Sequence, residues 1–116
     1  MTISVAMITF DTTDALALGQ WWARQTGGTI TEDNDGWFVL VSTGPGGPML
    51  AFQKVDDPTP GKNRIHLDLV AADREEGVAR LLADGATLVA HREMPGLHWT
   101  TLADPDGNQF CVSSPH

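Results

Sequence analysis

The chain has 116 residues, of which 41% are hydrophobic and 19% charged, a composition typical of one globular domain with a single core. Its formal net charge of −8 argues against nucleic-acid binding, because neutralising phosphates requires clustered Lys and Arg. No segment has the roughly 18 apolar residues of a membrane span, and the N-terminal residues do not resemble a signal peptide. The single cysteine, Cys111, excludes an internal disulfide and suggests a reducing compartment, so we expect a cytoplasmic protein.

The chain begins with the pattern of a strand followed by a helix. Residues 3–11 alternate as in a strand, and Asp14 is a suitable cap for a helix over residues 15–25. Adjacent residues of a helix cannot both face the core, so we expect Trp22 to be buried and Trp21 to reach an interface. The predicted buried stripe of this helix consists of Leu16, Leu18, Trp22 and Ala23.

Three short strands are predicted after this helix, at residues 29–30, 37–42 and 49–54. Turn-forming residues separate them, Asp33 to Gly36 in one case and Gly44 to Pro48 in the other. The first half of the chain is therefore expected to fold as βαβββ.

The second half predicts the same order of elements after a linker at residues 56–63. Residues 64–70 alternate as in a strand, and a helix runs from Asp73 to Gly85. The predicted inward residues are Ile65, Leu67 and Leu69 in the strand and Val78, Leu81 and Leu82 in the helix. Further strands are predicted at residues 87–90, 97–103 and 108–113. We expect one domain over residues 1–116, with one module at about 1–55 and another at about 62–114.

Two pairs of segments about 60 residues apart have the same pattern. Asp104 to Cys111 matches Gly44 to Ala51, and His66 to Asp73 matches Met7 to Asp14. Two copies are too few for a solenoid, which needs at least three, so they indicate a duplicated supersecondary unit.

The duplicated pattern resembles the vicinal oxygen chelate superfamily, which includes glyoxalase I, bleomycin-resistance proteins and extradiol dioxygenases. The resemblance covers nearly the whole chain, and the motifs that carry it are Asp104-Pro105-Asp106-Gly107-Asn108, Lys62-Asn63-Arg64-Ile65-His66-Leu67-Asp68 and His98-Trp99. These are most similar to small glyoxalase-like proteins of bacteria. The resemblance implies an α+β fold in which two βαβββ modules form one cup with a ligand cavity on its concave face. It also implies a homodimer.

The resemblance further implies where a metal would bind, because the first and last strands of each module supply one ligand each in metal-using members. Those positions here are Met7, Ala51, His66 and Cys111. Ala51 has no donor atom, and Met7 is a soft thioether with little affinity for nickel, zinc or iron. We therefore expect no cofactor, in particular no divalent metal of the usual glyoxalase or dioxygenase kind.

His66 lies on the polar face of its predicted strand and is the candidate general base, ligand contact or metal ligand. The alternative is a histidine partnered by Asp68. If residues 104–107 form a four-residue hairpin loop, His98 shares the face of Cys111. His66, His98 and Cys111 then form an atypical three-donor zinc site, the alternative to a metal-free protein. Cys111 is otherwise a small apolar filler.

Trp37 and Trp99 occupy nearly matching strand positions in the two halves. They either line an aromatic pocket or fill equivalent places beneath the helices, and a four-residue loop puts Trp99 on the Val112 side. Lys62 and Arg64 are candidates to attract an anionic ligand to the mouth of the cup, although exposed loop charges usually have no such role.

From these residues we expect a metal-independent small-molecule binding protein of the glyoxalase/bleomycin-resistance type. The contacts expected for its apolar or aromatic ligand in the concave cavity are Met7, Ala51, His66, His98, Cys111 and Trp37. The alternative is a lyase or isomerase that uses His66 as general base, with or without an atypical metal. A third alternative is a protein that acts through its surface, for which Trp21 is the candidate. The expected partners are a small-molecule ligand and a second copy of the chain, without nucleic acid or membrane.

Overall fold

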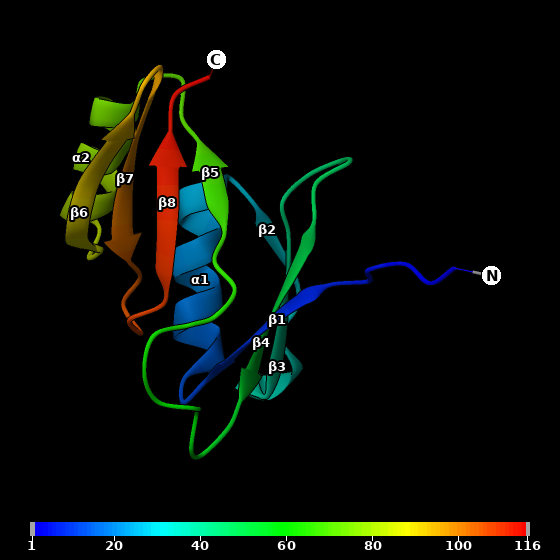
Figure 1. The fold of residues 1–116 in the computed structure, drawn as a ribbon. Coiled ribbons are helices and arrows are strands. Elements are labelled where there is room, and N and C mark those ends of the chain that lie inside the picture. The colour runs from blue at the N-terminus through cyan, green and yellow to red at the C-terminus, as the bar shows by residue number, and fades with distance from the viewer. Residues whose placement is uncertain (1, 116) are drawn as a thin grey trace. The chain divides into compact units, whose positions relative to one another are not determined.

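Each half of the chain forms a four-stranded sheet with one α-helix, in the order strand, helix, strand, strand, strand (Figure 1). The computed structural model describes residues 2–115, and the chain divides into one unit that ends at Pro60 and another that begins at Gly61. The predicted α+β class with two βαβββ modules is confirmed.

The two sheets have the same topology. The first unit contains β1 (Ile8–Thr12), α1 (Ala15–Thr26), β2 (Thr29–Glu32), a short 3₁₀ helix η1 (Asn34–Gly36), β3 (Phe38–Ser42) and β4 (Met49–Lys54). The second contains β5 (Asp68–Val70), α2 (Arg74–Ala83), β6 (Thr87–Met94), β7 (Leu97–Ala103) and β8 (Gln109–Ser113). The strand orders are β1-β4-β3-β2 and β5-β8-β7-β6, and the pairs β1–β4 and β5–β8 are parallel. The repeat in the sequence is therefore a repeat in topology.

Helix α1 covers one face of the first sheet and supplies its core. Asp14 caps the helix by accepting a hydrogen bond from a first-turn amide at 3.1 Å, and Gly27 ends it in the left-handed conformation. Trp22 is fully buried, and the ring centroid of Phe10 lies 5.7 Å from that of Trp22 and 4.9 Å from that of Phe52. This aromatic cluster holds the helix on the sheet.

The expected exposure of Trp21 is wrong. Trp21 is only 3% exposed and meets Trp22 edge-on, whereas Leu16, predicted to be buried, is 36% exposed. The helix lies very close to β3 at Gly19, where an added Cβ would be 2.9 Å from Val39 Cγ1. Trp21 and Trp22 follow the buried Leu18 by three and four residues, so both lie on the buried side of the helix.

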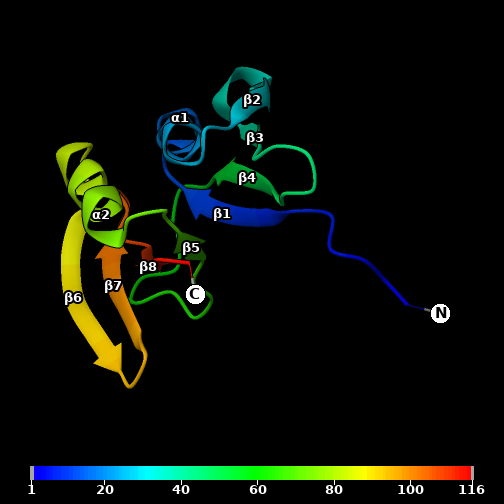
Figure 2. The same cartoon turned by 90° about the horizontal axis from the view of Figure 1, so that it is seen from above.

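Helix α2 lies across one face of the second sheet (Figure 2). Asp73 caps it by accepting a hydrogen bond from the amide of Glu76 at 3.2 Å. Val78 and Leu81 are buried, but Leu82, also predicted to be buried, is 39% exposed. Only a narrow stripe of this short helix contacts the sheet. The sheet face opposite α2 is not covered by this helix.

The strand predicted over residues 64–70 is shorter in the structure, and Ile65 is 81% exposed. The side chain of Asn63 is the reason: Nδ2 donates to the carbonyl oxygen of Gln109 at 2.9 Å, and Oδ1 accepts from its amide at 2.8 Å. Because both backbone groups of Gln109 already have partners, residues 64–66 do not pair with β8 there.

Two other strands differ in extent from their predictions. β1 begins at Ile8, where its pairing with β4 begins, and not at Ile3. β6 continues past Ala90 to Met94 and so brings Arg92 into the sheet. Among residues 2–115, no helix is long and apolar enough to cross a membrane.

Candidate functional site

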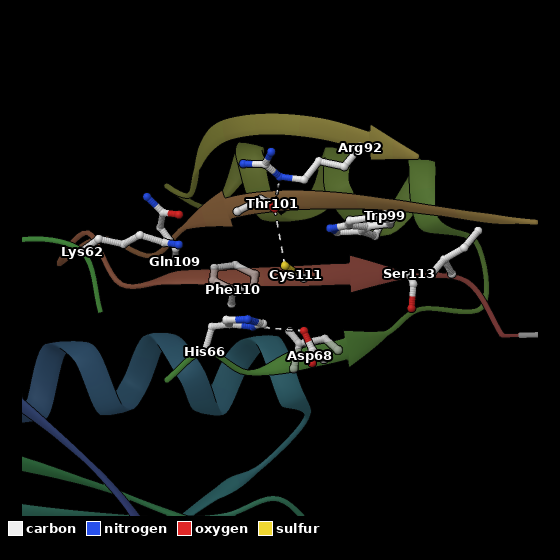
Figure 3. A pocket seen from close by; sticks show the side chains of 12 residues that line it. Lys62, His66, Asp68, Arg92, Trp99, Thr101, Gln109, Phe110, Cys111 and Ser113 are labelled. Atoms are coloured by element: carbon white, nitrogen blue, oxygen red, sulfur yellow. Dashed lines mark hydrogen bonds and ion pairs between the residues drawn. The ribbon is translucent and has the colours of Figure 1, made fainter. Parts of the chain in front are cut away.

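The face of the second sheet opposite α2 carries polar side chains from several strands, around a pocket of about 680 Å³ (Figure 3). Alternation along the strands brings them to one side, because residues two apart share a face. The pocket is lined by Lys62, His66, Asp68, Leu69, Arg92, Leu97, Trp99, Thr101, Gln109, Phe110, Cys111 and Ser113. All of these residues belong to the second unit.

Three potential metal ligands converge in this pocket. Asp68 and Cys111 are paired residues of the parallel strands β5 and β8, and the amide of Cys111 donates to the carbonyl of Leu67 at 3.0 Å. His66 lies on the same side, with Nδ1 3.2 Å from Asp68 Oδ1. One ligand atom from each of His66, Asp68 and Cys111 lies within 4.8 Å of the other two. The side chains of His66 and Asp68 are 46% and 74% exposed, so both are free to adjust.

Thr101 connects Cys111 to Arg92. Thr101 pairs with Cys111 across β7 and β8, with Oγ1 3.4 Å from Sγ, and Arg92 Nε donates to the same oxygen at 3.2 Å. A guanidinium can only donate, so Thr101 accepts from Arg92 and keeps its own hydrogen available for the sulfur. Thr101 is 5% exposed, and the contacts are therefore held within the sheet.

An aromatic surface and two cations lie at the same pocket. Trp99 and Arg92 are paired residues of β7 and β6, and Lys62 is a further lining residue. The pocket has these two cations and one carboxylate, Asp68, whereas the whole chain has seven Lys and Arg against 15 Asp and Glu, so positive charge is locally in excess. This arrangement suits a ligand with an apolar or aromatic part and an anionic group.

The β7–β8 hairpin differs from its prediction by one residue. The loop spans residues 104–108, because the Asp104 carboxylate accepts hydrogen bonds from the amides of Asp106 and Asn108, both at 2.9 Å. The partner of Cys111 is consequently Thr101, whereas the four-residue loop predicted residue 100. A shift of one residue exchanges the two faces of a strand.

The expected position of His98 is therefore wrong. His98 lies on the face opposite Cys111, where its Nδ1 is 3.3 Å from Glu93 Oε2 and α2 residues line a separate pocket. The structure does not bring His98 to His66 and Cys111; Asp68 takes that place. The same shift moves Trp99 from the expected Val112 side of the sheet to the side of the pocket.

The remaining candidates, Met7, Ala51 and Trp37, belong to the first unit. Met7 precedes β1, and Ala51 is fully buried in β4, where it pairs with Thr9 as Cys111 pairs with Asp68. Trp37 is 62% exposed beside η1, with Lys54 Nζ 4.7 Å from its ring centroid. The positions equivalent to His66 and Cys111 thus hold a thioether and a methyl group, and the four-position metal centre implied by the resemblance does not fit this chain.

The sequence predicts only some of the residues that line the pocket, and Asp68, Arg92 and Thr101 are among those that it does not. The sequence suggests Asp68 only as a partner for His66, although alternation along the strand places both residues on one face. Arg92 was missed because β6 was expected to end at Ala90. Thr101 was missed because its pairing depends on the length of the hairpin loop.

A family model described as a glyoxalase-like domain matches residues 7–113. Solved structures with the same fold include a glyoxalase/bleomycin resistance protein/dioxygenase family enzyme from Burkholderia phytofirmans PsJN, with a TM-score of 0.76 and 20% identity over 94% of this chain and 96% of that one. Lactoylglutathione lyase from Agrobacterium tumefaciens has a TM-score of 0.70 and 16% identity over 98% and 95% of the two chains. A mutant of the fosfomycin resistance protein FosX from Listeria monocytogenes, in complex with Mn(II) and 1S,2S-dihydroxypropylphosphonic acid, has a TM-score of 0.79 and 14% identity over 97% and 90%. The curated protein sequences include no match to this chain.

Proposed function

Because this chain belongs to the glyoxalase-like domain family, we propose that it binds a small organic molecule in the pocket of its second unit. The observation that carries the proposal is the pairing of Trp99 with Arg92 at this pocket, which sets an aromatic surface beside a fixed cation. The pocket volume of about 680 Å³ lies within the range of roughly 300 to 1,000 Å³ of small-molecule sites.

The proposed ligand has an apolar or aromatic part and one anionic group. Trp99 offers its ring for stacking, and the hydrogen bond from Arg92 to Thr101 orients the guanidinium before a ligand arrives. Lys62 adds a second cation, a compact ammonium group on a flexible side chain. An uncharged analogue of the same shape should therefore bind more weakly.

We propose that this binding requires no metal. Met7 and Ala51, at two of the four positions that hold ligands in metal-using members, have side chains unsuited to nickel, zinc or iron. A binding protein can accept such residues, whereas a glyoxalase of the ordinary kind cannot.

The second candidate function is a lyase or isomerase with His66 as general base. The observation that favours it is the 3.2 Å contact between His66 Nδ1 and Asp68 Oδ1, which orients the imidazole and leaves Nε2 to take a proton. One structure with this fold is a lactoylglutathione lyase.

Tryptophan fluorescence in the presence of EDTA tests the binding proposal. We expect phenylphosphonate and phenylacetate to change the emission of Trp99, and phenylacetamide to bind more weakly. Trp99→Phe should remove most of the signal, whereas Trp37→Phe, at an exposed indole of the first unit, should retain it. Arg92→Gln should weaken binding of the anions and leave the amide unaffected. Absence of binding by all three probes, or equal binding by wild type and Arg92→Gln, would contradict the proposal.

The two candidate functions differ in the fate of the ligand. Sequestration predicts that a bound molecule is recovered unchanged and that His66→Ala retains part of the affinity. Catalysis predicts a changed product by mass spectrometry, which His66→Ala should abolish while the ligand still binds.

We also propose that the protein forms a homodimer. β6 is an edge strand of its sheet, and its Leu88, Val89 and Met94 are 43%, 41% and 55% exposed, an unusual amount of apolar surface for an unprotected edge. Light scattering should give twice the chain mass for the wild type, and Val89→Lys should lower it. A monomeric wild type at all concentrations would contradict this proposal.

A further inference from the structure

We propose that His66, Asp68 and Cys111 form a site for one Zn²⁺ ion inside the second unit. This inference goes beyond the proposed function, because a ligand held by Trp99 and Arg92 requires no metal. It also differs from the ligand set implied by the resemblance. All three donors come from one unit, and Asp68 occupies none of the four positions that the resemblance assigns to metal ligands.

Strand pairing places the three donors. Asp68 and Cys111 are direct partners across β5 and β8, so their side chains leave the sheet side by side on one face. His66 precedes Asp68 by two residues and joins it on that face, as Figure 3 shows. The hydrogen bonds of Asn63 with Gln109 and of the Cys111 amide with Leu67 hold this part of the chain against β8.

The spacing of the donor atoms is close to that of zinc ligands. Bonds of about 2.0 to 2.3 Å in a tetrahedron put neighbouring ligand atoms roughly 3.3 to 3.8 Å apart. His66 Nδ1 and Asp68 Oδ1 are already 3.2 Å apart, and the three donors lie within 4.8 Å of one another. Closing the remaining gap requires movements of about 1 Å, and the exposed side chains of His66 and Asp68 can make them by rotation.

The chemistry of the donors favours zinc over magnesium and calcium. An imidazole, a carboxylate and a thiolate suit Zn²⁺, whereas Mg²⁺ and Ca²⁺ prefer oxygen ligands throughout. Thr101 supplies an outer contact, because its hydroxyl accepts from Arg92 and can donate to the sulfur of Cys111. Three protein donors leave the fourth tetrahedral position open to the pocket.

The alternative explanation is an ordinary hydrogen-bonded pair of His66 and Asp68 beside an unrelated thiol. The chain contains a matched pair with which to test it. His98 and Glu93 have an N–O distance of 3.3 Å and side-chain exposures of 62% and 75%, on the opposite face of the same sheet from Cys111. Any metal bound by an exposed histidine and carboxylate alone should bind this pair equally well.

The experiment is a titration of the untagged, EDTA-treated protein with Co²⁺, followed by displacement with Zn²⁺, in the absence of any organic ligand. We expect one Co²⁺ per chain and a thiolate-to-cobalt charge-transfer band, which must come from Cys111 because it is the only cysteine. Equimolar Zn²⁺ should remove the band. Mass measurement during the titration should show that the oligomeric state is unchanged by the metal.

Variants assign the other ligands. Cys111→Ser should lose the band, and His66→Ala and Asp68→Asn should each weaken zinc binding by at least tenfold. Loss of the outer contact in Thr101→Val should weaken it by roughly 10-fold to 100-fold. His98→Ala and Glu93→Gln should bind as the wild type does. Circular dichroism of each variant checks that the fold is retained.

Several results would overturn the inference. They are the absence of a charge-transfer band in folded wild type, unchanged affinity in Asp68→Asn, and equal losses in the His98 and His66 variants. A band that saturates at half an equivalent while the mass doubles would mean that Cys111 thiolates of two chains share the ion, which also contradicts a site within one unit. The fluorescence test contains EDTA, and the Co²⁺ titration contains no organic ligand. Each experiment therefore tests one proposal without depending on the other.

Discussion

Thr101 and Cys111 face each other across β7 and β8, with Oγ1 3.4 Å from Sγ. Thr101 also accepts the hydrogen bond from Arg92 on β6, so three adjacent strands meet at one hydroxyl group. The sulfur of Cys111 and the guanidinium of Arg92 are thus positioned by the same buried side chain.

Thr101→Val removes that hydroxyl and keeps the shape of the side chain. We expect the free energy of unfolding to fall by about 1 kcal/mol, the usual net worth of such a contact, and urea denaturation measures it. Thr9→Val at an exposed position of β1 is the control and should change stability by less than about 0.5 kcal/mol. A Thr101→Val protein as stable as the wild type would mean that the hydroxyl contributes nothing to the sheet.

Asn63 holds the backbone of Gln109 through two hydrogen bonds, one as donor and one as acceptor. Asn63→Ala should therefore speed hydrogen exchange of the Gln109 amide and destabilise the fold by about 1 to 2 kcal/mol. Asn63→Asp keeps the acceptor and loses the donor, so the Gln109 amide should remain protected in this variant. Equal exchange rates in the two variants would contradict the role given to the side-chain oxygen.

Asp104 is 3% exposed, and its carboxylate accepts hydrogen bonds from the Asp106 and Asn108 amides and from the Asn108 side chain. Asp104→Ala should destabilise the protein by about 3 kcal/mol, because several charge-assisted bonds are lost together. Thermal unfolding measures the effect. Asp57→Ala, in an exposed bend, should be nearly neutral. A loss below that of the Asp57 variant would show that the loop does not depend on the carboxylate.

Trp22 and Trp37 should differ widely in their contribution to stability. Trp22 is fully buried against Phe10, so Trp22→Ala should cost about 3 to 5 kcal/mol or prevent folding. Trp37 is 62% exposed and contacts Lys54, so Trp37→Ala should cost about 1 kcal/mol or less. Similar losses in urea denaturation of the two variants would mean that the aromatic cluster is not the core of the first unit.

The order of the elements was predictable because local chemistry marks it. Asp14 and Asp73 cap their helices as their position before an amphipathic segment indicates. Both copies of the repeat gave the same pattern, and this agreement made the βαβββ prediction secure.

Local chemistry did not predict which residues of β7 and β8 face the pocket. Their orientation depends on whether four or five residues form the loop after Ala103, and buried hydrogen bonds of Asp104 decide this. The end of the strand near His66 depends on Asn63, which contacts Gln109, 46 residues later. Contacts over such distances leave no periodic signal in the sequence. The prediction for Trp21 is wrong for another reason, because the buried stripe of α1 is wide enough to include two adjacent residues.

Thr9 pairs with Ala51 in the first unit at the position where Asp68 pairs with Cys111 in the second. The two units can therefore be compared residue by residue at this pair. In the first unit this pair consists of a hydroxyl and a methyl group, whereas in the second unit it consists of a carboxylate and a thiol. The strands form in both units, so the pairing does not depend on these side chains. Random mutagenesis with selection for zinc binding should therefore tolerate many residues at Thr9 and few at Asp68.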